Sequence, residues 1–311
     1  MTTILDRIKQ QNEDYIETVR PPFPKNMLLE LNNTCNHKCI FCGSSKMTRK
    51  KGQMEKKFVL RVLAEAYKEG TREIGFYNTG EPFMAKNLSD YIHFAKKIGY
   101  EYIYISTNGA LATPEKAKSV IDSGLDSIKF SINAFSKETY IKIHGSDDFD
   151  KVIENIKFFS DYRKQNNLNF KIYVTVVQTD LIKGEIEYGR NLLSPYVDDF
   201  YISIMGNQGG KNNYSNQPSR PKQIMKKCSM IYNTINISCE GYLTACCVDY
   251  QNELAICDLN KVSLKDGWYS DKYIALRRKH IKHDLDGTMC YTCLTNIKKK
   301  YLPLVKELAS D

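Results

Sequence analysis

Strand-like and helix-like runs alternate along most of the chain, which restricts the fold to a few architectures. Apolar runs rich in β-branched and aromatic residues predict strands at 27–33, 72–78, 101–106, 126–132, 170–177 and 198–204. Segments with helical spacing predict helices at 54–69, 86–98, 113–123, 137–165 and 184–194. Strands separated by helices pair in parallel through right-handed crossovers. Because a closed barrel needs eight such units, six units predict an α/β fold with an incomplete barrel.

Three cysteines follow the first of these strands at C-x3-C-x2-C spacing. Cys35, Cys39 and Cys42 can converge from one loop, and such soft thiolate ligands suit an iron–sulfur cluster or zinc. A four-iron cluster held by three cysteines leaves one iron open to a small-molecule ligand. Zinc would need a fourth protein ligand, and His37 inside the loop could supply it. The spacing alone therefore predicts a metal centre of one of these two kinds.

The aromatic residue before the third cysteine, Phe41, makes the iron–sulfur interpretation the stronger one. With it, the loop resembles the C-x3-C-x-aromatic-C signature of the radical S-adenosylmethionine (SAM) superfamily. The resemblance covers roughly residues 27–210 and implies a partial (β/α)6 TIM-like barrel. It also implies a [4Fe–4S] cluster whose open iron is chelated by SAM. Reductive cleavage of SAM would then give a 5′-deoxyadenosyl radical that abstracts a hydrogen atom.

Polar residues after the next strands match segments that bind SAM in this superfamily. The sequence NTGEP at 78–82 resembles the family's G-G-E-P bend, with Thr79 in place of the first glycine. A simple turn built from Gly and Pro is the alternative. The resemblance assigns the following residues to cofactor binding: Phe41, Asn78, Thr79, Gly80, Glu81, Pro82, Ser106, Asn108, Ser131 and Asn133. Asn133 can form hydrogen bonds but cannot act as a base. Weaker candidates at later strand ends are Thr175, Gln178 and Asn207.

A second group of cysteines lies near the C-terminus. Cys228 and Cys246 belong to a C-x12-G-x4-C pattern, and Cys290 and Cys293 form a later C-x2-C pair. This arrangement resembles the twitch domain, the shortened form of the SPASM extension of radical SAM enzymes. The resemblance implies that these four cysteines bind an auxiliary [4Fe–4S] cluster. Four cysteines in two pairs could instead hold structural zinc.

The C-terminal segment also predicts a β-hairpin, with strands at 230–238 and 242–250 and a two-residue connection at 240–241. A helix is expected at about 270–284. Three cysteines remain unassigned, namely Cys239, Cys247 and Cys257, and core packing is the expectation for each. Cys247 is nevertheless our candidate catalytic residue. It adjoins Cys246, so its thiol could pass a hydrogen atom to a substrate radical.

Composition sets the expected domain organisation. A chain of 311 residues with 42% apolar content can bury a barrel-sized core and a smaller second one. The segment 206–219 is rich in Gly, Asn and Ser and predicts a linker. We therefore expect a helical lead-in at 1–26, the radical SAM barrel at 27–210 and a twitch/SPASM-like domain at 211–311.

The clustering of the cysteines and the net charge indicate the cellular compartment of the protein and the kind of partner that it binds. No stretch reads as a signal peptide or a membrane span, and clustered cysteines suit metal ligation in a reducing compartment, so we expect a cytoplasmic protein. The net charge of +9 arises partly from basic runs at 45–57, 277–283 and 298–300. These are either solvated surfaces or contacts for an anionic partner. Such a partner would be an anionic small-molecule substrate or a flavodoxin- or ferredoxin-type electron donor.

The resemblance leaves two reaction outcomes open. In twitch enzymes similar to 2-deoxy-scyllo-inosamine dehydrogenase, the auxiliary cluster accepts an electron and a carbinol becomes a ketone. In radical SAM epimerases, a cysteine returns a hydrogen atom to the substrate. We favour the oxidoreductase, acting on a sugar, an aminocyclitol or a related small molecule, because about 26 residues before the first strand are too few for a peptide-recognition domain. The alternative of another class is a non-catalytic metal protein that binds nucleic acid, which only the basic charge supports.

Overall fold

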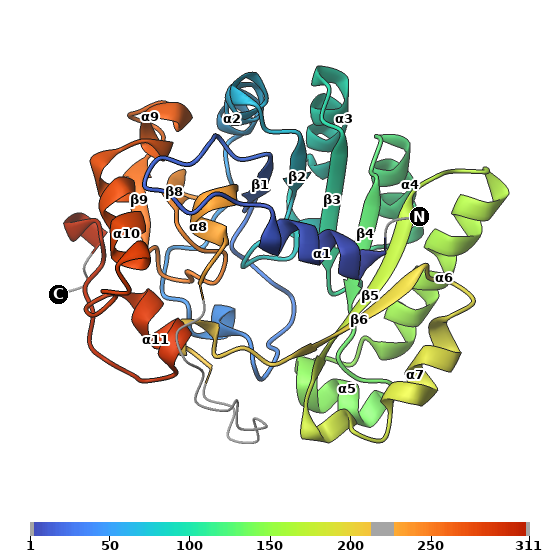
Figure 1. The fold of residues 1–311 in the computed structure, drawn as a ribbon. Helices are drawn as coiled ribbons and strands as arrows, with labels where there is room; N and C mark the ends of the chain where they lie inside the picture. The colour runs from blue at the N-terminus through green and yellow to red at the C-terminus, as the bar shows by residue number, and fades with distance from the viewer. Residues whose placement is uncertain (1–2, 213–226, 309–311) are drawn as a thin grey trace.

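One nine-stranded sheet runs through the protein (Figure 1). The structure is a computed structural model that describes residues 3–212 and 227–308. The strand order is β6-β5-β4-β3-β2-β1-β7-β8-β9. The barrel strands, all paired in parallel, are β1 (Asn26–Leu29), β2 (Glu73–Gly75), β3 (Tyr102–Thr107), β4 (Ser127–Ser131), β5 (Lys171–Gln178) and β6 (Asp199–Ile204). This arrangement confirms the predicted α/β class and its six parallel units.

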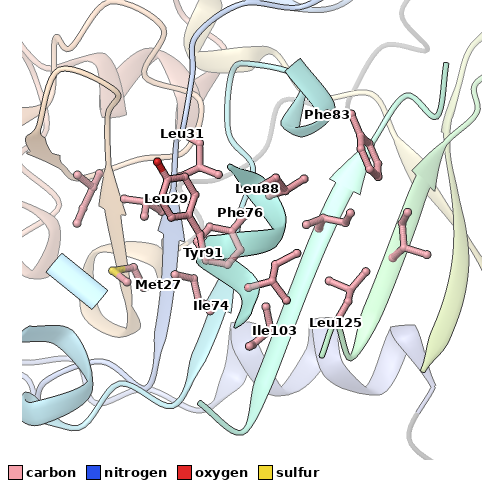
Figure 2. Packing of buried hydrophobic residues seen from close by; sticks show 14 of the residues in the cluster. Met27, Leu29, Leu31, Ile74, Phe76, Phe83, Leu88, Tyr91, Ile103 and Leu125 are labelled. Atoms are coloured by element: carbon pink, nitrogen blue, oxygen red, sulfur yellow. The ribbon is translucent and has the colours of Figure 1, made fainter. Parts of the chain in front are cut away.

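Helices cover the outer face of the barrel strands. They are α2 (Lys56–Glu69), α3 (Leu88–Ile98), α4 (Pro114–Asp122), α5 (Lys137–His144), α6 (Phe149–Gln165) and α7 (Ile186–Leu193). Gly145 ends α5 at φ +68°, which divides the long helical span expected at 137–165. Figure 2 shows Leu88 and Tyr91 of α3 packed beside Leu29 and Phe76. Full burial of such a side chain contributes about 1.5–3 kcal/mol, and these contacts hold the helices against the sheet.

The concave face of the sheet is polar. Its side chains come from alternate positions of three strands, namely Tyr102, Tyr104 and Ser106 of β3, Ser127, Lys129 and Ser131 of β4, and Tyr173 and Thr175 of β5. The intervening residues, such as Ile103 and Ile128, are fully buried on the helix side. Ser131 Oγ lies 3.4 Å from both Ser106 Oγ and Thr175 Oγ1. A lumen with hydroxyl and amino groups suits a polar ligand.

The lead-in helix α1 (Ile4–Glu13) lies across this concave face (Figure 1). A capping box starts it: Asp6 N donates to Thr3 Oγ1 and Thr3 N donates to Asp6 Oδ2. Arg7 then pairs with Glu73 Oε2 at 2.7 Å, and its guanidinium lies 3.4 Å from the centre of the Tyr102 ring. These contacts fix α1 near the amino ends of β2 and β3, where it covers one end of the lumen.

The C-terminal segment continues the barrel sheet. β7 (Thr234–Ile237) pairs in parallel with β1, and β8 (Tyr242–Thr244) and β9 (Ala255–Asp258) follow in antiparallel order. The hairpin prediction was correct in kind but wrong in detail, because Met230–Asn233 forms the helical turn α8. Ser238 N donates to Tyr242 O, so three residues, 239–241, form the turn instead of two.

Three helices complete the C-terminal segment, namely α9 (Leu264–Trp268), α10 (Asp271–Ile281) and α11 (Met289–Thr295). α10 confirms the helix expected at about 270–284. The basic run that begins in it is not simply a solvated face, because Arg277 is fully buried and donates to Ile231 O and Trp268 O. The expected linker is described only up to residue 212, and the rest of it, 213–219, lies outside the described residues. None of the helices in the described ranges is long and apolar enough to cross a membrane.

Candidate active site and cluster sites

The cysteine loop lies at the carboxyl end of β1. Cys42 N donates to Cys39 O at 3.0 Å, and the loop is pinned to the end of α5 by Lys38 N, which donates to His144 O. Desolvation raises the pKa of the Cys35 thiol to about 11, and neighbouring acidic groups, among them the Cys42 thiol, contribute to the shift. The three thiols thus interact with one another, and their role as cluster ligands stays a prediction.

The three loop thiols do not all lie within 4.8 Å of one another in the described part of the chain. Among the described residues, one group with all ligand atoms within 4.8 Å contains Cys39 together with His37 and His144, and the three loop cysteines do not form such a group. Zinc binds sulfur at about 2.3 Å and would draw all its ligands closer. His37 Nε2 instead contacts Asp148 Oδ2 at 3.0 Å. The His37 ring is thus held by Asp148, and zinc with His37 as fourth ligand stays an alternative on these contacts alone.

The bend after β2 docks onto the cysteine loop. Glu81 N donates to Thr34 O at 2.8 Å, and Asn32 Nδ2 donates to Glu81 O at 2.9 Å. A Cβ atom at Gly80 would lie 2.1 Å from Asn32 O, so only glycine permits this approach. Thr79, at the position of the family's first glycine, is buried and donates its hydroxyl hydrogen to Glu30. The predicted G-E-P bend and the cysteine loop thus form one unit.

The Glu81 carboxylate is fully used inside the protein. It accepts from Thr107 Oγ1 at 2.6 Å, Asn108 N at 2.9 Å and Phe83 N at 3.1 Å. Burial raises the pKa of Glu81, and these hydrogen bonds act in the opposite direction. The carboxylate therefore ties the end of β2 to the end of β3, and the bend meets a ligand through its backbone and its neighbours.

Two asparagines offer polar atoms beside the cysteine loop. Asn108 Nδ2 donates to Asn36 Oδ1 at 2.9 Å and lies 3.7 Å from Cys35 Sγ. Asn78 Oδ1 is buried and has no partner in the described part of the chain. A buried acceptor without a donor costs free energy, so a ligand N–H fits this position. Phe41 and Pro82, by contrast, are buried within the protein.

The last of the predicted polar positions, Asn133, contacts a histidine that the sequence analysis did not identify. Its backbone N–H donates to His144 Nε2 at 3.3 Å, and His144 Nδ1 lies 3.4 Å from Cys39 Sγ. Because Nε2 accepts a hydrogen bond, the proton of the neutral ring must be on Nδ1. Desolvation lowers the pKa of His144 to about 3, which keeps the ring neutral. The imidazole thus donates an N–H to a candidate cluster ligand.

The four C-terminal cysteines also come together. Cys290 and Cys293 lie one turn apart on α11, Cys246 follows β8, and Cys228 precedes α8. Desolvation raises the pKa of Cys228 to about 11, and the nearby Cys293 thiol adds to the shift. As in the first loop, no single-ion group of these four thiols is present among residues 3–212 and 227–308. Four thiols would supply a complete ligand set for a cluster with no open iron.

Cys247 interacts electrostatically with residues of the barrel lumen. Its hydrogen bond with Cys246 lowers the pKa of the Cys247 thiol, and the positive charge of Lys129 lowers it further. Burial raises the pKa of Tyr77, which follows β2, and the charge of the Cys247 thiol raises it further. Of the other unassigned cysteines, Cys239 is buried with its sulfur within 4.8 Å of carboxylate oxygens of Glu30 and Glu240, and Cys257 Sγ lies 2.7 Å from where a Cβ on Gly267 would be.

A buried ion-pair network joins the two cysteine-bearing regions, and sequence reasoning missed it. Arg49 donates to both carboxylate oxygens of Glu30, at 3.0 and 2.9 Å, and also pairs with Glu240. Arg49 Nε donates to Tyr250 O, and the Tyr250 hydroxyl lies 3.9 Å from Cys42 Sγ. The sequence did offer one signal: Glu30 is a charged residue within a mostly apolar strand-like run, which indicates that a cation inside the protein pairs with it.

The three weaker candidates from the later strand ends lie in different surroundings. Thr175 lines the lumen beside Ser131. Gln178 is exposed, and Asn207 Nδ2 donates to the carbonyl oxygens of Thr292 and Cys293 at 3.0 Å. Asn207 thus holds the end of α11 and has a structural role.

Two family models match the chain. The radical SAM superfamily model matches residues 29–187, more than half of the chain, and the SPASM model, an iron–sulfur cluster-binding domain, matches residues 228–294. The chain belongs to the radical SAM superfamily. Its cofactors are therefore SAM, a SAM-binding [4Fe–4S] cluster and an auxiliary cluster in the SPASM domain. The radical SAM and SPASM predictions from the sequence are confirmed.

Relatives and solved structures agree with this membership. A probable GTP 3′,8-cyclase of Saccharolobus solfataricus is 33% identical over 133 residues, which are 43% of this chain and 42% of that protein. The match thus spans about two fifths of that relative's length.

Three solved radical SAM structures share the fold. BtrN in complex with AdoMet and 2-DOIA aligns with a TM-score of 0.59 at 16% identity, over 91% of this chain and 96% of BtrN. SuiB of Streptococcus suis bound to its precursor peptide aligns with a TM-score of 0.68 at 15% identity, over 87% and 69%. The protein anSMEcpe with bound AdoMet gives 0.63 at 15% identity, over 91% and 93%. At such identities these likenesses show the fold alone.

Proposed function

We propose that this radical SAM enzyme oxidises a carbinol of a sugar, an aminocyclitol or a related small molecule. Cys35, Cys39 and Cys42 would hold the cluster that, with SAM bound, would supply the radical chemistry for removal of the carbinol hydrogen atom, and the C-terminal cysteines would hold an auxiliary cluster able to accept one electron. Loss of the hydroxyl proton and one electron then turns the substrate radical into a carbonyl. The observation that carries this proposal is the convergence of four thiols in the C-terminal region beside a polar barrel lumen.

We assign the ligands by position. The SAM-binding cluster takes Cys35, Cys39 and Cys42, and the auxiliary cluster takes Cys228, Cys246, Cys290 and Cys293. The bend around Gly80, with the free acceptor Asn78 Oδ1, would orient SAM beside the first set. We keep the divisions 1–26, 27–210 and 211–311 as proposed units, although the second and third share one sheet.

An epimerase is the second candidate, and the position of Cys247 favours it. A core-packing cysteine would lie among apolar side chains, whereas this thiol is close to Lys129 and Tyr77 of the lumen. A thiol there could return a hydrogen atom to a substrate radical, with its own proton replaced from solvent. Oxidation remains our first proposal because an epimerisation has no need of a four-thiol electron acceptor.

The fate of one hydrogen atom separates the two reactions. Oxidation removes the hydrogen and does not replace it, so product formed in D2O carries no deuterium at the reacting carbon. Epimerisation refills that carbon from an exchangeable donor, so deuterium enters there. We expect a carbonyl product without deuterium, formed equally well by Cys247→Ala. Deuterium that is lost in Cys247→Ala and retained in the control Cys257→Ala would establish the epimerase instead.

A reductant must deliver electrons to the first cluster. We propose a flavodoxin- or ferredoxin-type donor, since such proteins are acidic and exposed lysines Lys50, Lys51 and Lys300 remain on the basic runs. We also place the enzyme in the cytoplasm, where a reducing environment keeps its thiols free. Pull-down of a recombinant flavodoxin, weakened by salt and by charge reversal at Lys50, would test the contact.

A further inference from the structure

A lysine in the barrel lumen has no carboxylate partner in the described part of the chain. Lys129 lies on β4, on the concave face of the sheet, and is in part buried. No ion pair or hydrogen bond of its ammonium group is present among residues 3–212 and 227–308, and its closest aromatic contact is Tyr77, whose ring centre is 5.2 Å from Nζ. Removing an ammonium group from water without a counter-charge costs free energy. Such a cation is typical of a site that a ligand completes.

The surroundings of Lys129 form a small cavity with hydroxyl groups. Tyr77, Tyr104, Ser127 and Tyr173 line it, and α1 covers its other side. Arg7 of α1 also lines the cavity, but it is already paired with Glu73 and stacked on a tyrosine ring. Lys129 is therefore the cation of this cavity that has no carboxylate partner among the described residues, and the Cys247 thiol is the acidic group whose charge acts on it.

Lys129 is also close to the groups that would carry out the reaction. Ser106 is its register partner on β3, and Ser131, two residues further along β4, lies one layer nearer the carboxyl ends of the strands. Tyr104 of β3 and Tyr173 of β5 line the same cavity on either side of β4. A ligand held at Lys129 would therefore extend toward the SAM-binding segments.

We propose that the substrate carries an anionic group, a carboxylate or a phosphate, that pairs with Lys129 Nζ in the lumen. This inference rests on the proposed function and narrows its substrate class. An aminocyclitol would bring an ammonium group next to an unpaired ammonium group and would be repelled, whereas an acidic sugar would supply the missing charge. The substrate is thus a hydroxylated acid or phosphate ester.

A matched set of sugars tests this inference. The probes are glucose, glucosamine, glucuronate and glucose 6-phosphate, which share a ring and differ in charge. Dissociation constants are measured anaerobically on the reconstituted enzyme with SAM bound. A hydrogen bond between charged groups strengthens binding, so we expect the acidic sugars to bind at least about tenfold more tightly than glucose. Preference for glucuronate or for glucose 6-phosphate tells a carboxylate from a phosphate.

Variants complete the test. Lys129→Met should abolish the preference for acidic sugars and Lys129→Arg should keep it. The control is Lys171→Met, whose ammonium already has Asp198 as a partner at 3.4 Å and whose loss should not alter the preference. As a second measurement, inorganic phosphate should raise the melting temperature of the wild type and not of Lys129→Met. Identical behaviour of wild type and Lys129→Met towards every probe overturns the inference. If the wild type cleaves SAM and still shows no preference, this inference alone fails; if it cannot cleave SAM, the proposed function fails.

Discussion

Replacing His144 by leucine should lower the reduction potential of the SAM-binding cluster. In the wild type, Asn133 N–H holds His144 Nε2, and Nδ1–H points at Cys39 Sγ from 3.4 Å. A donor to a cluster sulfur stabilises the more negative, reduced state, because hydrogen bonds to the ligand sulfurs help to set the potential. Leucine fills the buried site without a donor.

The size of the shift follows from the strength of one such bond. A hydrogen bond to a charged acceptor contributes about 1.5–3 kcal/mol. If about half of this distinguishes the reduced from the oxidised state, the difference is about 1 kcal/mol. A tenfold change in a one-electron equilibrium is 59 mV, so we expect the potential to fall by roughly 40–60 mV.

The assay is an EPR-monitored redox titration of the reconstituted enzyme, in which the signal of the first cluster is identified by its change when SAM is added. His144→Asn is the rescue variant, because its amide N–H can take the place of Nδ1–H. Tyr140→Phe is the control for packing. Its ring stacks on His144 with centroids 4.1 Å apart, and its hydroxyl has no partner in the described part of the chain. Equal potentials in wild type and His144→Leu, at equal iron content, would refute the reasoning.

Three further predictions follow from the buried polar contacts. Glu81→Ala removes three hydrogen bonds and should lower the free energy of unfolding by roughly 3 kcal/mol. It should also weaken SAM binding more than it lowers the iron content. Unchanged SAM affinity in this variant would show that the bend is only a structural turn. Arg49→Met leaves Glu30 buried without its partner and should cost about 3–5 kcal/mol in chemical denaturation, whereas Lys50→Met, on the surface, should cost little. Burial lowers the pKa of His280 from 6.5 to about 4. Because the unfolded chain takes up a proton on His280 more readily than the folded chain, the free energy of unfolding is highest above pH 6.5 and should fall by roughly 3 kcal/mol as the pH falls toward 4. This loss should be absent in His280→Leu.

Much of the fold was predictable because local patterns and tertiary contacts agree. Each barrel strand is a short apolar run with a helical segment after it. The apolar side of each helix packs against the sheet, as the spacing of its apolar residues predicts. The cysteine loop, the G-E-P bend and the segment after β3 could be placed together because parallel strands end at one edge of a sheet. Hydrogen bonds of Glu81 and Asn108 now account for that grouping.

What the sequence did not reveal depends on contacts between distant segments. Nothing local shows that β7 pairs with β1, since the same apolar residues could form an isolated hairpin. His144 lies 105 positions after Cys39, and its role needs α5 to end beside the cysteine loop. Arg49 stands in a basic run that reads as surface, yet three carbonyl or carboxylate partners converge on it. Such contacts are fixed by tertiary geometry, which periodicity cannot supply.

The central claim is that two separate cysteine sets hold two clusters, and the first of them activates SAM. Iron counting on anaerobically reconstituted protein, with 5′-deoxyadenosine formation under dithionite, tests it directly. From two four-iron clusters we expect about eight irons per chain and SAM cleavage in the wild type. Replacing Cys35, Cys39 and Cys42 by alanine should leave about four irons and no cleavage. Four irons in the wild type and none in the variant would contradict the account.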